Sequence, residues 1–534
     1  MSRTILLEIG TEEMPARFVA EAAEQLKDKV SKWLTAQRIP YGEVMTFETP
    51  RRFTVLIKDV QEQQEDSNEE LRGPARKIAV DEEGNWSKAA LGFARGKSLS
   101  PDDLYLQEVG GVEYVFARKH EAGRPTVELL PELGNIITGL TFPKNMKWGS
   151  YELKFVRPIR WIVALYGTDI IPLEITGVKA GKETQGHRFL GQQTTIERPE
   201  DYARKLAEQY VLVEPEERKQ RILSQIKELE TARGWTVPLD EDLLDEVVHL
   251  VEYPTALFGS FEEEYLQIPR QVLVTSMREH QRYFPVENEQ GELLPHFVTV
   301  RNGDDRDIEI VARGNEKVLR ARLSDARFFY EEDQKMKIEE ALQRLETVVF
   351  HEELGTIGDK IHRVQDTAMQ IAQKIGTNAE DRKKLQRAAE ISKFDLVSLM
   401  VYEFPELQGI MGERYARLLG EDEEVAKAIF EHYLPRFAGD ILPETIAGAL
   451  LSIADKLDTI TGCFAIGIIP TGSQDPYALR RQVPVLCRSY WINSCLYRST
   501  PCLTFRSPFW RANRCSSGTA SKSKVIYRSF LRSA

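Results

Sequence analysis

The sequence lacks the short motifs that mark most autonomous active sites. It contains neither of the glycine-rich patterns G-x-G-x-x-G and G-x-x-x-x-G-K-[ST], which place backbone amides against phosphate groups. The patterns G-x-S-x-G and H-E-x-x-H are also missing, and with them the strongest signals for a serine hydrolase or a zinc protease. We therefore expect no catalytic residue and no bound cofactor in this chain.

Long apolar runs and an excess of basic charge are missing as well. No stretch of about 18 apolar residues is present to span a bilayer, and the amino-terminal segment becomes acidic before the apolar core of a signal peptide can form. We therefore expect a cytoplasmic protein with no membrane partner. The chain has 83 acidic and 71 basic residues, a net charge of −12, which opposes diffuse attraction to nucleic acid. Any RNA contact must come from local basic patches.

The apolar periodicity predicts several domains of two kinds. At about 150 residues per domain, 534 residues suggest three or four units. Period-two alternation and short apolar runs predict strands at residues 5–9, 53–57, 113–118, 159–165 and 297–300. Spacings of three and four predict a long packed helix over residues 357–375. We therefore predict an α+β multidomain fold, with a mixed α/β region of more than one module over residues 1–335 and an all-helical domain over residues 336–482.

The run RGNEKVLRARLSDAR, residues 313–327, predicts an amphipathic helix with a cationic face. Leu319 and Leu323 belong to its apolar stripe, which can bury against a core. A row of basic side chains on another face can contact successive RNA phosphates and release their counterions. The basic candidates in this run are Arg313, Lys317, Arg320, Arg322 and Arg327. The alternative is a solvated, salt-bridged face, for which the available partners are Glu316, Asp325 and Glu331.

Basic and aromatic residues also alternate in several short clusters, such as FVRPIRW at residues 155–161 and HRF at residues 187–189. Aromatic rings can stack on exposed RNA bases while neighbouring cations bind phosphate. The RNA-binding candidates in these clusters are Arg51, Arg52, Lys144, Lys147, Arg157, Arg160, Arg188 and Arg282. The alternative places Trp148 and Trp161 in a core and gives His187 a structural role.

Three polar residues of the helical region form an incomplete metal-ligand set. His351, Asp395 and Asp455 match the early His, the Asp of a His-Asp pair and the final Asp of a metal-dependent phosphohydrolase. Phe394 stands where the second His would be, and a phenyl ring cannot ligate a metal. We therefore expect no metal here, and we expect Asp395 and Asp455 to be buried polar or helix-end residues.

Long segments in one order carry a resemblance to a known family. They include LLEIGTEEMPARF, FPKNMKWG, FVRPIRW, GNEKVLRARLSDARFFYEED, MVYEFPELQGIMGERYA and PTGSQDPYALRRQ, and they cover nearly all of residues 1–482. Taken together, these segments resemble the β subunit of bacterial glycyl-tRNA synthetase.

This resemblance implies a tetramer of two α and two β subunits that joins glycine to its tRNA with ATP and magnesium. In that family the α subunit holds the adenylate-forming site, whereas the β subunit contributes tRNA recognition and assembly and is inactive alone. The absence of H-x-G-H and K-M-S-K-S, the signatures of class I tRNA synthetases, agrees with that division. The resemblance also implies that residues 336–482 form a degenerate HD-type domain. An HD-type phosphohydrolase and a noncatalytic RNA-binding protein are the alternatives.

The sequence departs from the family after Gln482. The 52 residues from Val483 onward contain nine basic residues and no acidic one, together with four of the five cysteines. We interpret this Cys/Ser/Arg-rich tail, residues 483–534, as the product of a reading-frame change that replaces an anticodon-binding domain, and we expect it to be disordered. The alternatives are a natural basic tail that binds RNA and a zinc site, although the cysteines lack the short spacing of zinc knuckles.

Overall fold

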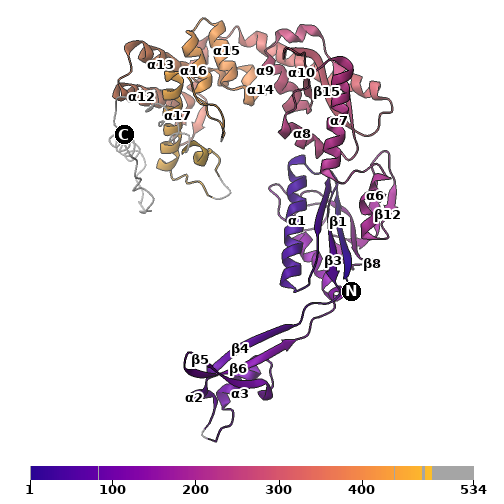
Figure 1. Cartoon of the computed structure of the whole chain (residues 1–534). Helices are drawn as coiled ribbons and strands as arrows, with labels where there is room; N and C mark the ends of the chain where they lie inside the picture. Colours follow the sequence, from indigo (N-terminus) through magenta and orange to yellow (C-terminus); the bar gives the residue numbers. More distant parts are fainter. Residues whose placement is uncertain (1, 82, 438, 472–474, 484–534) are drawn as a thin grey trace. The chain divides into compact units, whose positions relative to one another are not determined.

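The computed structural model describes residues 2–81, 83–437, 439–471 and 475–483, so the expected tail lies outside the described residues except for Val483. The chain forms two compact units (Figure 1). Unit 1 comprises residues 1–260 and 282–315, and unit 2 comprises residues 261–281 and the chain from residue 316 onward. The division falls inside helix α10 (Ile308–Asp333), whereas the expected domain boundary lay at the end of this helix. The architecture is mixed α+β, as predicted.

A seven-stranded sheet with the order β2-β3-β1-β7-β10-β9 forms the centre of the amino-terminal part of unit 1, and β8 pairs with β7. Its strands are β1 (Ser2–Thr11), β2 (Val44–Thr49), β3 (Arg52–Gln61), β7 (Ile159–Tyr166), β8 (Asp169–Ile170), β9 (Glu174–Ile175) and β10 (Val178–Gly181). β1 pairs antiparallel with both β3 and β7 and therefore lies inside the sheet. The predicted strands at residues 5–9, 53–57 and 159–165 are confirmed.

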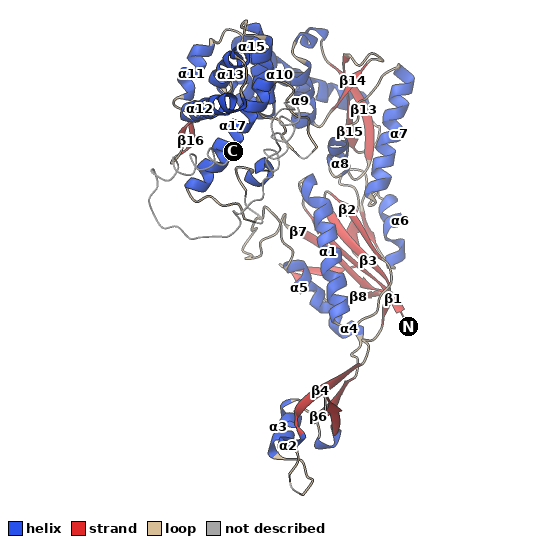
Figure 2. Ribbon diagram, turned by 60° about the vertical axis from the view of Figure 1, so that its left-hand side comes forward, coloured by secondary structure: helices blue, strands red, loops and turns tan. Residues whose placement is uncertain are grey.

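Helices cover both faces of this sheet. One face packs against α1 (Ala16–Ala36), α4 (Thr126–Leu129), η2 (Leu130–Glu132) and α5 (Leu133–Thr138) (Figure 2). On the other face, Tyr202 and Leu206 of α6 (Tyr202–Ala207) pack against Leu6 and Leu56. The period-two alternation of residues 53–57 is typical of a half-buried strand, but this strand is buried on both faces because α6 covers its second face.

A small three-stranded module follows β3 in the chain. Its antiparallel sheet has the order β4-β6-β5, with the bounds β4 (Ser67–Ala75), β5 (Leu104–Val109) and β6 (Val112–Glu121). The helices of this module are α2 (Arg76–Ala79), α3 (Lys88–Gly96) and η1 (Pro101–Asp103). Ala90, Ala94 and Val115 belong to a separate small core. The predicted strand at residues 113–118 is confirmed within β6.

The rest of unit 1 contains a second antiparallel sheet, with the order β13-β15-β14. Its strands are β13 (Pro254–Ser260), β14 (Phe284–Glu287) and β15 (Leu293–Asn302), and the last of them confirms the strand predicted at residues 297–300. The helices α7 (Pro215–Arg233) and α8 (Glu241–Val248) bury Ile222, Ile226 and Leu244 against this sheet. Between the two sheets in sequence lie η3 (Pro199–Asp201) and the hairpin of β11 (Glu183–Gln185) and β12 (Gln193–Thr195).

Unit 2 is mostly helical. Its longer helices after α10 are α11 (Ile338–Leu345), α12 (Ile357–Ile375), α13 (Ala379–Ile391), α15 (Ile410–Leu418), α16 (Glu423–Glu431) and α17 (Ile446–Ala465). Shorter helical segments are η4 (Glu263–Gln267), α9 (Arg270–Thr275), η5 (Ser276–Gln281), η6 (Phe394–Val397), α14 (Leu399–Glu403) and η7 (Pro405–Leu407). The predicted helix at residues 357–375 is confirmed. The expectation of an all-helical domain is wrong at one place, because β16 (Val349–His351) and β17 (Gly355–Thr356) pair as a hairpin.

Across the described ranges of both units, no helix combines the length and the apolar character needed to cross a membrane.

Gly10→Ala is expected to weaken the amino-terminal sheet. A Cβ at residue 10 would lie 1.9 Å from the Trp161 ring, so β1 and β7 would have to shift, at a cost of about 1–3 kcal/mol. Hydrogen–deuterium exchange resolved to β1 and β7 measures this effect, and faster exchange is the expected result. Gly134→Ala is the matched control, because its Cβ would have its nearest neighbour at 3.9 Å. Equal exchange in the two variants would contradict this packing.

Candidate nucleic-acid interface

Arg52, one of the predicted RNA contacts, lies inside a buried polar network. Its guanidinium bonds Oε1 of Glu252 at 3.0 Å and Oγ1 of Thr184 at 3.1 Å, and it lies 3.6 Å from Oε1 of Glu8. Thr184 in turn donates to Glu8 at 2.6 Å, and Thr49 donates to Glu252 at 2.9 Å. The side chains of Arg52, Glu8 and Glu252 are at most 1% exposed. The network therefore links β1, β3 and β11 to the segment that precedes β13.

The burial of this network corrects the prediction for Arg52. Protein encloses its guanidinium, so the expectation that Arg52 contacts RNA is wrong. Arg51 is also held inward, because its side chain is 12% exposed and donates to Gly186 O at 3.2 Å and to Glu252 Oε2 at 3.4 Å. Burial alone would raise the pKa of Glu252, but the guanidinium groups of Arg52 and Arg51 outweigh burial and hold that pKa below its ordinary value. The charged carboxylate therefore fixes both arginines.

His187 fixes a tight loop next to this network. Its Nε2 lies 3.1 Å from Oδ1 of Asn302, which also accepts the backbone N–H of Glu252 at 2.9 Å. Since this oxygen accepts, Nε2 carries the proton, and Nδ1 accepts the backbone N–H groups of Phe189 and Leu190, each at 3.3 Å. Burial lowers the pKa of His187, which favours the neutral ring that this arrangement requires. His187 therefore has a structural role.

The loop presents Arg188 and Phe189 at the surface. Phe189 is 83% exposed. Arg188 bonds Glu12 at 3.2 Å and Glu13 at 2.9 Å. Arg160 bonds Glu12 at 2.9 Å, and Arg157 donates to the backbone oxygen of Glu13 at 2.9 Å. The structure thus gathers predicted contacts into one surface group, the Arg188 cluster, which consists of Arg157, Arg160, Arg188 and Phe189.

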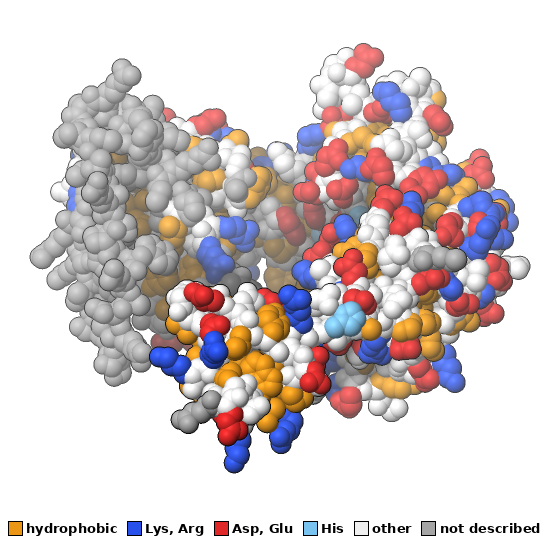
Figure 3. All heavy atoms as spheres, turned by 60° about the horizontal axis from the view of Figure 1, so that its bottom comes forward, with side chains coloured by type: hydrophobic (Ala, Val, Ile, Leu, Met, Phe, Trp, Pro, Cys, Tyr) orange, Lys and Arg blue, Asp and Glu red, His pale blue; other side chains and the backbone are white. Residues whose placement is uncertain are grey.

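The other basic candidates of unit 1 differ in their surroundings. Lys147 forms an ion pair with Glu152, and Arg282 bonds Glu246 at 2.8 Å. Lys144 is exposed and has no ion pair within the part of the chain that the structure describes. On the face drawn in Figure 3, acidic and basic side chains are interspersed, as expected for a chain whose net charge is −12. Many of its cations are therefore neutralised by close acidic neighbours.

Part of the cationic run on α10 is salt-bridged within unit 2. Arg320 bonds Glu262 at 2.6 Å. Arg327 bonds Glu264 at 3.1 Å and Glu331 at 2.9 Å. Glu331 is one of the partners that the sequence made available, whereas Glu262 and Glu264 come from the segment around η4. The salt-bridged alternative therefore describes this part of the helix.

Arg313, Lys317 and Arg322 are exposed and have no ion pair or side-chain hydrogen bond among the described residues. Arg313 and Lys317 lie about one turn apart on the same side of α10. Arg322 follows Arg313 by nine positions, which places it on the opposite side at about 3.6 residues per turn. Leu319 and Leu323 are fully buried, so the predicted apolar stripe is confirmed. Arg313 and Lys317 are thus neighbouring exposed cations on one side of α10.

The side chains of two residues in the incomplete metal-ligand set accept hydrogen bonds from backbone N–H groups. Asp395 is fully buried, as expected, and accepts the N–H groups of Gly409 at 2.6 Å and Gly412 at 3.1 Å. Burial raises the pKa of Asp395 to about 6. His351 lies at the end of β16, where its Nδ1 accepts the N–H of Glu353 at 3.1 Å.

Ammonium groups surround the third residue of this set. The Oδ1 atom of Asp455 lies 3.2 Å from Nζ of Lys360 and 3.3 Å from Nζ of Lys393. Burial alone would raise the pKa of Asp455, but these ammonium groups outweigh it and hold that pKa far below its ordinary value. Within the described ranges, no three His, Cys, Asp or Glu side chains are grouped so as to hold a metal ion.

Sequence reasoning missed the acidic half of the buried network. Glu8 interrupts the apolar run ILLEIG, and a carboxylate inside such a strand is a signal for a buried ion pair. Glu252 carried no comparable signal, because Arg52 precedes it by 200 residues.

Comparisons with known proteins cover most of the chain. A family profile described as glycyl-tRNA synthetase beta subunit matches residues 5–503. The glycine–tRNA ligase beta subunit of Halalkalibacterium halodurans is 61% identical over 480 residues, which cover 90% of this chain and 69% of the relative. That of Bacillus subtilis is 59% identical over 478 residues, with 90% and 70% covered. The beta subunit of Listeria monocytogenes is 54% identical over 481 residues, which cover 90% of this chain and 70% of the relative.

These matches first define a class, because profile and relatives alike are components of an aminoacyl-tRNA synthetase, a ligase. The chain belongs to the glycyl-tRNA synthetase beta subunit family. The resemblance seen in the sequence is thereby confirmed, and the matched region contains the buried network, the Arg188 cluster and α10.

Glu252→Gln is expected to destabilise unit 1, because it keeps the side-chain shape but removes the carboxylate closest to Arg52. Removing one partner of a buried ion pair costs about 3–5 kcal/mol. Urea unfolding measures the loss, and Glu152→Gln, which breaks only the exposed pair with Lys147, should cost less than about 1 kcal/mol. The double variant Arg52→Met/Glu252→Gln should lose less than the sum of the single variants. Strictly additive losses would argue against direct pairing.

The same pair gives a pH dependence with a defined sign. The folded pKa of Glu252 lies below the ordinary value of 4.5, so its contribution to stability is present above about pH 4.5 and is lost as the pH falls through the folded pKa. The difference in stability between the wild type and Glu252→Gln should therefore be largest near neutral pH and shrink on acidification.

Proposed function

We propose that this chain is the β subunit of a tetrameric glycine–tRNA ligase with two α and two β subunits, and that it contributes tRNA recognition and assembly. The observation that carries the proposal is the match over 90% of the chain to relatives named glycine–tRNA ligase beta subunit. A beta subunit implies an α partner, which in this assembly holds the adenylate-forming site with its ATP and magnesium. The β chain supplies no catalytic residue, is inactive alone and works in the cytoplasm.

The exposed side of α10 is the proposed contact with tRNA phosphates. Arg313 and Lys317 lie four residues apart, about 6 Å along the helix axis, so both can reach the same stretch of backbone. Because neither is paired within the described residues, phosphate binding breaks no internal ion pair. Their contribution to the binding free energy is therefore the release of counterions, with no loss of an ion pair inside the protein.

The Arg188 cluster is a second proposed contact, of a different kind. Phe189 is 83% exposed on a loop that His187 braces, so its ring can stack on an unpaired base with little loss of conformational entropy. Glu12 and Glu13 form ion pairs with Arg160 and Arg188 and partly neutralise their charges. This cluster therefore contributes stacking more than counterion release.

The phosphohydrolase alternative gains no support from Asp455, because Lys360 and Lys393 hold its Oδ1 atom. A lysine ammonium cannot activate water as a metal ion does.

Glycine attachment tests the proposal directly. The α subunit of the Bacillus subtilis relative is purified alone, and glycylation of its tRNA is measured with and without this chain. A second version of this chain carries the relative's sequence in place of residues 483–534. We expect this version to stimulate glycylation and the unmodified chain to stimulate it less. No stimulation by either version, with correct folding verified, would refute the assignment.

The α10 contact predicts a change in the salt dependence of tRNA binding. Arg313→Ala/Lys317→Ala should weaken binding and lower the slope of log K against log salt by about 1 for each lost phosphate contact. Arg322→Ala is the matched control, because it removes an exposed cation from the opposite side of the same helix. Phe189→Ala should weaken binding with the slope unchanged. An unchanged affinity and slope in the double variant would assign this side of α10 to structure alone.

A further inference from the structure

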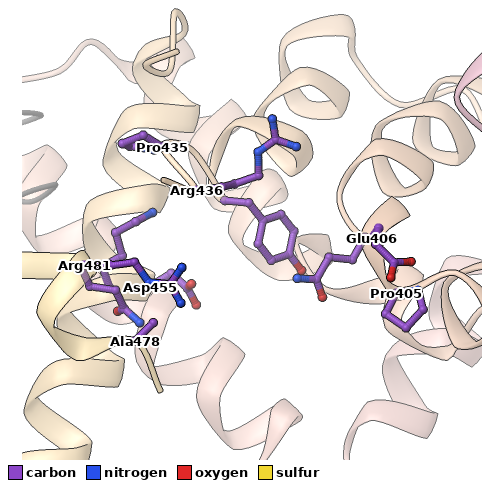
Figure 4. A pocket seen from close by; sticks show the side chains of 11 residues that line it. Pro405, Glu406, Pro435, Arg436, Asp455, Ala478 and Arg481 are labelled. Atoms are coloured by element: carbon purple, nitrogen blue, oxygen red, sulfur yellow. The ribbon is translucent and has the colours of Figure 1, made fainter. Parts of the chain in front are cut away.

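A cavity of about 370 Å³ lies within unit 2, beside Asp455 (Figure 4). Its walls come from the segment around η7, the segment that follows α16, helix α17 and residues 478–482. Figure 4 shows Arg481 and Asp455 on one side and Glu406 on the opposite side. The volume falls in the range of small-molecule sites, about 300–1,000 Å³.

Besides Oδ1 of Asp455, which is held by ion pairs alone, two polar atoms in the walls of this cavity are buried without a hydrogen-bond partner. They are the hydroxyl oxygen of Tyr433 and the side-chain oxygen Oε1 of Gln482. The Gln482 amide is fixed, because its Nε2 donates to the carbonyl of Tyr477 at 2.8 Å. A buried polar atom without a partner destabilises a protein unless water or a ligand satisfies it. Both atoms have less than 1 Å² of accessible surface, so a molecule in the cavity can hydrogen-bond to either of them only after the neighbouring side chains shift.

The wall behind Asp455 is rich in ammonium groups. Lys360 and Lys393 share Oδ1 of Asp455, and Lys393 also donates to Nε2 of His432 at 2.8 Å. His432 is neutral, because its Nδ1 donates to the carbonyl of Ile429 at 2.6 Å and burial holds its pKa well below the ordinary value. The imidazole thus adds no charge to this wall.

Further basic side chains lie at this wall. Lys456 lines the cavity, but burial lowers its pKa to about 8, and its Nζ already donates to the carbonyls of His432 and Leu434. The carboxylate of Asp458 is already shared between Lys360 at 3.2 Å and Arg363 at 2.7 Å. Arg481 also lines the cavity and has no ion pair among the described residues. An anionic group in the cavity would therefore be attracted to Arg481, whose charge no carboxylate of the described residues neutralises.

The opposite wall supplies acceptors. Glu406 has no ion pair within the part of the chain that the structure describes, and the lining residue Arg436 is already paired with Asp440 at 3.0 Å. Glu406 and Oε1 of Gln482 can both accept hydrogen bonds from hydroxyl or amino groups. A ligand that suits the whole cavity therefore combines an anionic group with hydroxyl or amino donors.

We propose that this cavity binds a nucleoside monophosphate, either as a free nucleotide or as the terminal nucleotide of an RNA chain. The phosphate contacts Arg481 and the hydroxyl of Tyr433, and the sugar or base donates to Glu406 and Gln482. Inorganic phosphate alone would leave most of the cavity unfilled. Because Lys360 and Lys393 occupy Asp455, the site binds its ligand without breaking a bond. Only the RNA-end form of this inference rests on the proposed function.

Isothermal titration calorimetry of the full chain with AMP, adenosine and inorganic phosphate tests the site. AMP should bind, whereas adenosine and inorganic phosphate should each bind with an affinity at least about ten-fold lower. Adenosine lacks the anionic group, and phosphate lacks the sugar and base that donate hydrogen bonds. Arg481→Ala and Tyr433→Phe should each weaken AMP binding, the former by about ten-fold. Neither variant removes an internal hydrogen bond of the free protein, so both should keep the wild-type melting temperature.

Arg95→Ala, which removes an exposed arginine of α3 in unit 1, is the control and should bind AMP as the wild type does. Competition with a short single-stranded RNA then distinguishes the sources. Displacement of AMP by the RNA, sensitive to Arg481→Ala, identifies an RNA end, whereas no displacement identifies a free nucleotide.

The inference is overturned if neither AMP nor the RNA binds, or if binding is the same in Arg481→Ala and Tyr433→Phe as in the wild type. That result leaves glycylation by the assembled enzyme untouched. Conversely, AMP binding that depends on Arg481 stands even where this chain fails to stimulate the α subunit.

Discussion

The buried ion pair between Arg52 and Glu252 is the interaction on which the arrangement of unit 1 depends. It joins the first residue of β3 to a carboxylate 200 positions later in the chain, and Glu8 on the central strand β1 lies on the other side of the same guanidinium. A guanidinium buried without a carboxylate would cost several kcal/mol, so unit 1 reaches a stable state only when all three segments meet. Asn302 and His187 extend this constraint to the loop that carries Phe189.

The many acidic residues of the chain form local ion pairs with its basic residues. Carboxylates lie next to many of its basic residues, including Arg160, Arg188, Arg320 and Arg327. Such exposed pairs contribute little to stability, about 0–1 kcal/mol each, but they reduce the charge available to a polyanion. Arg313 and Lys317 are two neighbouring cations that no carboxylate neutralises among the described residues, whereas Lys144 and Arg322 are single cations of the same kind. Under the proposed function, such unpaired cations are the places where this acidic protein contacts a phosphate backbone.

Periodicity predicted the elements whose burial follows a regular local pattern. The strands β1, β3, β6, β7 and β15 and the helices α10 and α12 were all found from alternation or from spacings of three and four. Which faces of these elements are exposed to solvent was harder to predict. The second face of β3, for example, is covered by α6, which lies far away in sequence. The hairpin of β16 and β17 is too short to carry a periodic signal.

The fate of individual basic residues was less predictable than the elements that carry them. Arg51 and Arg52 have the same local sequence signal as Arg157 and Arg160, yet the first two point into a network and Arg160 is 61% exposed. The difference arises from Glu252, an acidic partner whose proximity depends on the tertiary fold. Glu262 and Glu264 likewise reach Arg320 and Arg327 only in the folded chain. Local sequence identifies a cation, whereas only the fold decides whether a carboxylate of the same protein or a phosphate of another molecule neutralises it.

The basic motifs of this chain divide into an internal scaffold around Arg52 and the proposed external tRNA contact on α10. A cryo-electron microscopy structure of the chain assembled with an α subunit and glycine tRNA tests it most directly. We expect tRNA phosphates within hydrogen-bonding distance of Arg313 and Lys317, and we expect Arg52 to be enclosed between Glu8 and Glu252. A tRNA backbone that avoids α10, or that reaches Arg52, would contradict it.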